Sequence, residues 1–167
     1  MEVDVRSLVG RAFGLLAVGL LLLAVVLAVP DPPDAPARAW QPPDGYRLTS
    51  TLTLADDREL RLWTGTSGWY VEQRRSGRTE AGVGAGGGGD RYDATEILGG
   101  LVVRVPAVGA RSILVRSTGG TVRGLVDAGT SLVPVPPPGV DSVVVLPLDA
   151  AGTPLIPEVT VAVAGRE

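Results

Sequence analysis

The longest hydrophobic stretch of the chain lies near its N-terminus. Residues 12–29 read AFGLLAVGLLLLAVVLAV and carry no charge. As a helix with a rise of about 1.5 Å per residue they would span about 27 Å, close to the roughly 30 Å hydrocarbon core of a bilayer. Arg6 and Arg11 precede the stretch, and positive charge favours the cytoplasmic side. The pattern predicts a transmembrane helix over 12–29 that serves as a signal anchor, with a short cytoplasmic tail over 1–11.

A cleavable signal peptide is the alternative interpretation of this stretch. Ala35-Pro36-Ala37 has the small-x-small form of a cleavage site, and cleavage after Ala37 would release a secreted protein. The apolar run is longer than the core of about 7–15 residues that signal peptides usually have, which favours the anchor. Both interpretations place everything after residue 30 outside the cell membrane.

The segment that follows is rich in proline. Residues 30–45 read PDPPDAPARAWQPPDG. Such a segment favours extended polyproline II structure at about 3.1 Å per residue, so it could span about 50 Å. We expect a stalk that holds an extracytoplasmic domain away from the bilayer.

From Tyr46 onward, hydrophobic and polar residues alternate. Leu48, Leu52 and Leu54 share one face of a first strand, and Leu60 and Leu62 share one face of the next. The Ala-Asp-Asp-Arg sequence between them supplies turn chemistry, and a third strand follows Gly68. This pattern predicts an antiparallel meander with one solvated face.

The rest of the chain contains further short strand patterns separated by turn signals. The segments ILGGLVVRV, ARSILVRS, TVRGLVD, SLVPV, VDSVVVLPL and EVTVAVAG bring the total to about nine strands, and no segment after residue 30 has a helical period. Strands at this spacing predict an all-β ectodomain over 46–165, an antiparallel β-sandwich of immunoglobulin-like (Ig-like) architecture. The expected inward-facing residues are Leu52, Leu54, Leu60, Leu62, Val71, Val103, Ile113, Val115, Leu125, Leu132, Val144, Val161 and Val163.

Composition limits the chemistry that this domain can perform. The chain has no cysteine and no histidine, and all fifteen of its basic residues are arginine. These absences exclude thiolate, imidazole and lysine nucleophiles or bases and the usual zinc ligands. We therefore expect no enzymatic activity, no catalytic residues and no cofactor. The net charge of −3 implies no nucleic-acid partner.

A glycine-rich run and an acidic series imitate ligand sites. Gly82-x-Gly84-x-x-Gly87 matches a dinucleotide fingerprint, but a charged stretch precedes it and no crossover helix follows. We expect a flexible loop over residues 76–90 and no bound nucleotide. Asp90, Asp93 and Glu96 follow one another at three-residue intervals, but a calcium site needs about six to eight oxygen ligands, so we expect a solvated acidic loop with no metal.

Aromatic and arginine side chains form the candidate interaction surface. Trp63 is out of phase with Leu60 and Leu62, so it should face outward. Two functions remain open: a structural or binding subunit of a bacterial envelope protein assembly, and a module that binds cell-wall polysaccharide through stacked aromatics. We expect the arginines to be neutralised by neighbouring Glu72 and Glu80. The candidate residues are Trp63, Trp69, Tyr70, Arg74, Arg75 and Tyr92.

Overall fold

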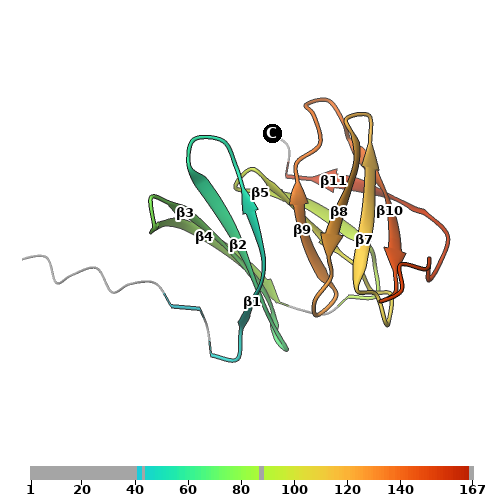
Figure 1. Cartoon of the computed structure of the whole chain (residues 1–167), viewed down its shortest axis with the longest axis horizontal. Coiled ribbons are helices and arrows are strands. Elements are labelled where there is room, and N and C mark those ends of the chain that lie inside the picture. Colours follow the sequence, from blue (N-terminus) through green and yellow to red (C-terminus); the bar gives the residue numbers. More distant parts are fainter. Residues whose placement is uncertain (1–40, 43, 87–88, 166–167) are drawn as a thin grey trace, which may run out of the picture. The chain divides into compact units, whose positions relative to one another are not determined.

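The first four strands form an antiparallel meander. In the computed structural model, which describes residues 41–42, 44–86 and 89–165, they are β1 (Arg47–Thr53), β2 (Arg58–Gly65), β3 (Gly68–Arg75) and β4 (Arg78–Gly86). They lie in the order β1-β2-β3-β4 (Figure 1). Asp56 and Asp57 both have positive φ, at 62° and 56°, which is the backbone of a two-residue hairpin turn that aspartate tolerates. The predicted meander is confirmed.

The predicted N-terminal elements lie outside the described residues. The cytoplasmic tail over 1–11, the transmembrane helix over 12–29 and nearly all of the stalk over 30–45 belong to this part. Within the described ranges, the protein is all-β and holds no helix long and apolar enough to cross a membrane.

The expectation of a flexible loop over 76–90 is wrong for residues 78–86, which form β4. This strand pairs with β3 from Arg75↔Arg78 to Gly68↔Gly86. The prediction rests on the backbone freedom of glycine, which disfavours a single fixed geometry. Here the neighbouring strand supplies the packing, because the Tyr70 side chain lies over the glycines of β4.

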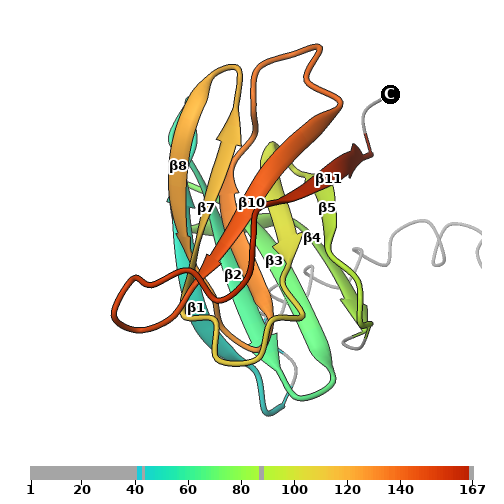
Figure 2. The same cartoon turned by 90° about the vertical axis from the view of Figure 1, so that its right-hand side faces the viewer.

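The remaining strands form a seven-stranded sheet. Its order is β8-β7-β10-β11-β5-β6-β9, and all pairs are antiparallel except the parallel pair β11–β5. Figure 2 shows β8, β7 and β10 side by side. The strands are β5 (Asp93–Ile97), β6 (Gly100–Arg104), β7 (Ser112–Ser117), β8 (Gly120–Leu125), β9 (Thr130–Pro134), β10 (Ser142–Leu148) and β11 (Val159–Ala164).

This sheet curls until its two edge strands, β8 and β9, face each other. A Cβ atom added to Gly124 of β8 would lie 2.2 Å from Ser131 Oγ and 2.6 Å from Val133 Cγ1 of β9. Side chains from both halves of the sheet meet inside the curl, among them Val103 of β6 and Val145 of β10, which are fully buried. We call this cluster the main core.

A second cluster, the interlayer core, joins the meander to β6 and β9. It consists of Leu60, Leu62, Trp69, Val71, Val102 and Leu132. Val102 faces this cluster while Val103 faces the main core, so β6 is buried on both faces. The continuous apolar run Leu-Val-Val follows from this double burial, because neither face needs a polar residue.

Several predicted inward positions differ in the structure. Leu125 is 64% exposed, because β8 turns the small Gly124 toward β9 and the neighbouring residue outward. In β10 the fully inward residues are Val143 and Val145, so Val144 was assigned the wrong phase. Leu48 is 44% exposed, because a β-bulge between Leu48 and Ser50 moves it to the opposite face from Leu52. Residues 41–165, apart from 43 and 87–88, contain eleven strands instead of about nine.

Asp127 connects the β8–β9 turn to the meander. Its carboxylate accepts hydrogen bonds from Arg47 of β1 and from Thr64 Oγ1 of β2. Burial raises the pKa of Asp127, but the hydrogen bonds from Arg47 and Thr64 and the charges of Arg47 and Arg111 outweigh it and lower the pKa below 3.8.

We expect Asp127→Asn to destabilise the protein by about 1–2 kcal/mol at pH 7, because it removes charged hydrogen bonds between the two sheets. A depressed folded pKa adds stability above the unfolded pKa, and this stability is lost as the pH falls through the folded value. The difference between wild type and variant should therefore shrink to nothing in strongly acidic urea titrations. Asp141→Asn, at an exposed position, is the control. A stability difference between wild type and Asp127→Asn that persists unchanged at acidic pH would show that the charge of Asp127 does not cause it.

Candidate functional site

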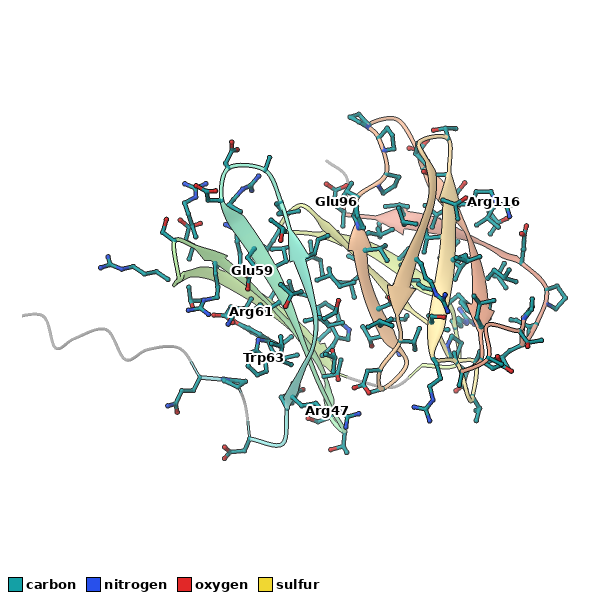
Figure 3. The ribbon with its side chains drawn as sticks, in the orientation of Figure 1. Arg47, Glu59, Arg61, Trp63, Glu96 and Arg116 are labelled. Carbon is teal, nitrogen blue, oxygen red and sulfur yellow. The ribbon has the colours of Figure 1, made fainter. Side chains whose placement is uncertain are left out.

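The solvent-facing side of the meander carries a row of apolar and aromatic residues. We call this side the outer face, since Leu60, Leu62 and Val71 point the other way into the interlayer core. The register pairs Leu48 with Trp63, Trp63 with Tyr70, and Tyr70 with Gly84, which places these four residues in one line across β1 to β4. We call this line the aromatic row. The predicted outward orientation of Trp63 is confirmed, and Figure 3 shows Glu59, Arg61 and Trp63 in succession along β2.

Tyr70 lies directly over the backbone of β4. A Cβ atom added to Gly82 would be 1.5 Å from Tyr70 Oη, and one added to Gly84 would be 2.9 Å from Tyr70 Cδ2. No side chain other than hydrogen fits beneath the ring at these two positions. Aromatic residues that cover cross-strand glycines in this way restore the packing that glycine lacks. The two glycines therefore leave the space in which the Tyr70 ring packs against β4.

Glu72 positions Trp63 from within the sheet. Glu72 is only 3% exposed, and its Oε2 atom accepts a hydrogen bond of 3.2 Å from Trp63 Nε1. Its other oxygen accepts a hydrogen bond from Thr79 Oγ1 and lies 3.5 Å from Arg74 Nε. A buried carboxylate needs such partners, because an unpaired buried charge is costly. Glu72 thus anchors the indole and is itself neutralised by Arg74.

Charged residues beside the aromatic row form ion pairs across short distances. Arg61 pairs with Glu59 on the outer face. Arg75 Nε lies 3.6 Å from Glu80 Oε1, while Arg74 pairs with Glu72. The predicted neutralisation of Arg74 and Arg75 is confirmed. The outer face is therefore a mixed surface with an apolar row and locally compensated charge.

Of the six predicted surface residues, three share the outer face and three lie elsewhere. Trp63, Tyr70 and Arg74 share the outer face. Trp69 points the opposite way and is 7% exposed in the interlayer core. Tyr92 packs against the main core, where burial raises the pKa of its hydroxyl.

Arg75 is exposed at the end of β3, out of phase with Arg74. The sequence-based selection omitted Leu48, Glu72, Gly82 and Gly84, which complete the site. Glu72 could have been found, because it follows Tyr70 by two residues and so shares its face.

A cleft of about 380 Å³ opens near the end of the meander. It is lined by residues that include Trp69, Arg104, Asp90 and Thr130. The indole nitrogen of Trp69 is buried and has no hydrogen-bond partner among the described residues. The lining of the cleft includes both an arginine and a carboxylate and therefore does not select one ligand.

Metal-ligating residues do not gather in the described part of the chain, where no three acidic residues lie close enough to hold an ion. Gly82 and Gly84, the start of the dinucleotide-like motif, lie inside a strand and not in a loop between a strand and a helix. The outer face combines the aromatic row with charged side chains that neighbouring residues compensate. Its arrangement suits contact with another flat, partly apolar surface.

Comparison of the chain with models of protein families, with curated proteins and with solved structures found no match.

Proposed function

We propose that the protein is a non-enzymatic, single-pass subunit of a bacterial envelope protein assembly. An anchor over residues 12–29 holds it in the cell membrane, and its extracytoplasmic β-domain binds another envelope protein through the outer face of the meander. The apolar stretch and the proline-rich stalk support the location. The lack of cysteine, histidine and lysine supports a role in binding.

The observation that carries this proposal is the fixed aromatic row. Trp63 is hydrogen-bonded to Glu72, and the Tyr70 ring rests on two glycines. Aromatic side chains dominate the energetics of protein interfaces, and those that are ordered before binding lose less entropy on association. Arg61 and Arg74 at its border add the polar contacts that interfaces use at their rims.

The Ig-like architecture of the seven-stranded sheet is part of the same proposal. Strands β5, β6 and β9 form one layer, and β8, β7, β10 and β11 form the other, with the main core between them. The parallel pair β11–β5 connects the layers. This strand order supports a sandwich of the Ig or fibronectin type, to which the meander adds a third layer.

Chemical cross-linking in native membranes, followed by mass spectrometry, tests the proposed function by identifying the partner. We expect Trp63→Ala and Tyr70→Ala each to weaken partner binding about thirtyfold, the effect of losing about 2 kcal/mol at an interface hot spot. Leu125→Ala, exposed on the other sheet, is the matched control and should bind as wild type does.

Other outcomes of these experiments would identify a different function. Retention on purified cell-wall polysaccharide that disappears in Trp63→Ala would favour the carbohydrate-binding alternative, because a flat aromatic pair also suits stacking on sugars. A turnover activity abolished by a single Asp or Glu substitution would overturn the non-enzymatic proposal.

A further inference from the structure

Over residues 81–86, one sheet edge of the described structure lacks the features that usually protect edge strands. Strand β4 ends the four-stranded sheet and packs extensively against β3 alone. From Ala81 to Gly86 it contains no charge and no proline. An edge strand of this kind presents unpaired backbone groups to other strands.

The other three edges are protected. Strand β1 contains a β-bulge and lies beside β9. Strand β8 also lies beside β9, where the seven-stranded sheet closes on itself, and Pro134 ends β9. Proteins commonly use bulges, prolines and covering strands to prevent edge pairing. The pairing of β4 with β3 has its own irregularity opposite Gln73 and Arg74, but from Ala81 to Gly86 the strand has none of these protecting features.

We infer that β4 pairs with β4 of a second copy of this chain, antiparallel and centred on Val83. The inference is independent of the proposed function. In this register Val83 faces its own copy, Gly82 faces Gly84, Ala81 faces Ala85 and Glu80 faces Gly86, so that two meanders form one eight-stranded sheet. The strand is self-complementary in this arrangement, because each position from Ala81 to Ala85 meets a small or apolar residue.

Burial on the inner side of the strand supports the partner. Val71 on β3 is fully buried, whereas its neighbour Val83 on β4 is 42% exposed, so the seven-stranded sheet covers β3 but not β4. The pairing brings Val83 of both copies together, and two valines directly opposite each other remove apolar surface from water.

The outer side of the strand accommodates the same partner. Each Tyr70 ring lies over its own Gly82 and Gly84. The two β3 strands would be three strand spacings apart, about 14 Å, so both rings fit without overlap. An unrelated strand with large side chains opposite Gly82 and Gly84 would clash with the ring of Tyr70.

Charge also favours the antiparallel register. The charged residues Arg75, Arg78 and Glu80 lie at the start of β4 or before it. Antiparallel pairing places these groups of the two copies at opposite ends of the contact, where like charges do not meet. Parallel pairing would set each charge beside its own copy, which is destabilising.

The absence of cysteine makes disulfide trapping a direct test on the purified full-length chain. We expect Val83→Cys to form a disulfide-linked dimer under mild oxidation at least about tenfold faster than Val108→Cys, since pairing raises the local thiol concentration to the millimolar range. Val108 is the matched control because it is 97% exposed on a loop. Circular dichroism and thermal unfolding establish that both variants are folded.

Two further positions test the register. Ala81→Cys alone should not cross-link efficiently, because its copy lies about 13 Å away along the strand, four residues apart. A mixture of Ala81→Cys and Ala85→Cys chains should cross-link rapidly. Efficient self-linking at all three positions would indicate parallel pairing and overturn the inference.

Sedimentation of the cysteine-free protein gives the second measurement. We expect wild type and Val108→Lys to sediment as dimers and Val83→Lys to sediment as a monomer, because a lysine at the centre of the contact places two like charges together. A monomeric wild type with slow trapping at position 83 would overturn the inference. A dimer that persists in Val83→Lys would also overturn it, since the contact would then lie elsewhere.

Discussion

Gly82→Val is expected to displace the Tyr70 ring from the outer face and to destabilise the protein by about 1–3 kcal/mol. A Cβ atom at this position would lie 1.5 Å from Tyr70 Oη, so the ring must move away and lose its packing. Chemical denaturation measures the loss of stability. The same variant should lose binding through the aromatic row, because Tyr70 would no longer lie in line with Trp63.

Whether Gly82→Val lowers or raises the stability of the protein depends on Tyr70. In a Tyr70→Ala background there is no ring to displace, and valine is better suited to a strand than glycine, so Gly82→Val should become neutral or stabilising. Gly86→Val is the matched control, because the nearest atom to its added Cβ is 3.9 Å away. Equal destabilisation in both backgrounds would show that the glycine is required for another reason.

Leu62→Ala is expected to cost about 2–5 kcal/mol, whereas Leu125→Ala should cost less than about 1 kcal/mol. Leu62 is fully buried in the interlayer core, so its truncation leaves a cavity between the meander and the seven-stranded sheet. Leu125 is 64% exposed on β8. Urea unfolding of both variants compares two leucines that the hydrophobic pattern alone places in the core.

The difference between the stability losses of these two variants tests where the tertiary structure places each leucine. Similar losses for the two variants would mean that β8 turns Leu125 inward and would contradict the observed position of Gly124. A large loss for Leu62→Ala alone would also establish that the meander and the seven-stranded sheet depend on each other for stability.

Alternation of hydrophobic residues determined most of the local structure. Leu60 and Leu62 in β2 and Val71 in β3 were predicted to face inward, and all three are fully buried. The outward orientation of Trp63 follows from the same period, because successive residues of a strand point to opposite faces. The all-β class could therefore be predicted without any long-range information.

Alternation does not predict which residues face inward where a strand is irregular. The bulge in β1 reverses the side of Leu48, and nothing in the alternation marks the extra residue. In β10, three consecutive valines gave no alternation from which to choose between Val144 and its neighbours. Bulges and continuous apolar runs remove the signal on which such predictions depend.

The aromatic part of the candidate site was only partly predictable. The sequence indicated that Trp63 and Tyr70 belong to strands, and cross-strand register then placed them side by side. Trp69, also proposed for the surface, alternates with Tyr70 and lies on the buried side. Adjacent residues in a strand point to opposite faces, so the sequence itself implies that Trp69 and Tyr70 are separated.

The sequence by itself determined the all-β class of this protein, because strand alternation is a local property. The membrane anchor over residues 12–29 stays a prediction from the same sequence. Only the tertiary structure decided that a glycine run forms β4, that β6 and β9 are buried on both faces, and that Asp127 joins the two sheets. Each of these features depends on contacts between residues far apart in the chain. A glycine-rich segment can pair as a strand when a tyrosine far away in the sequence packs over it. Local propensity does not include that contact.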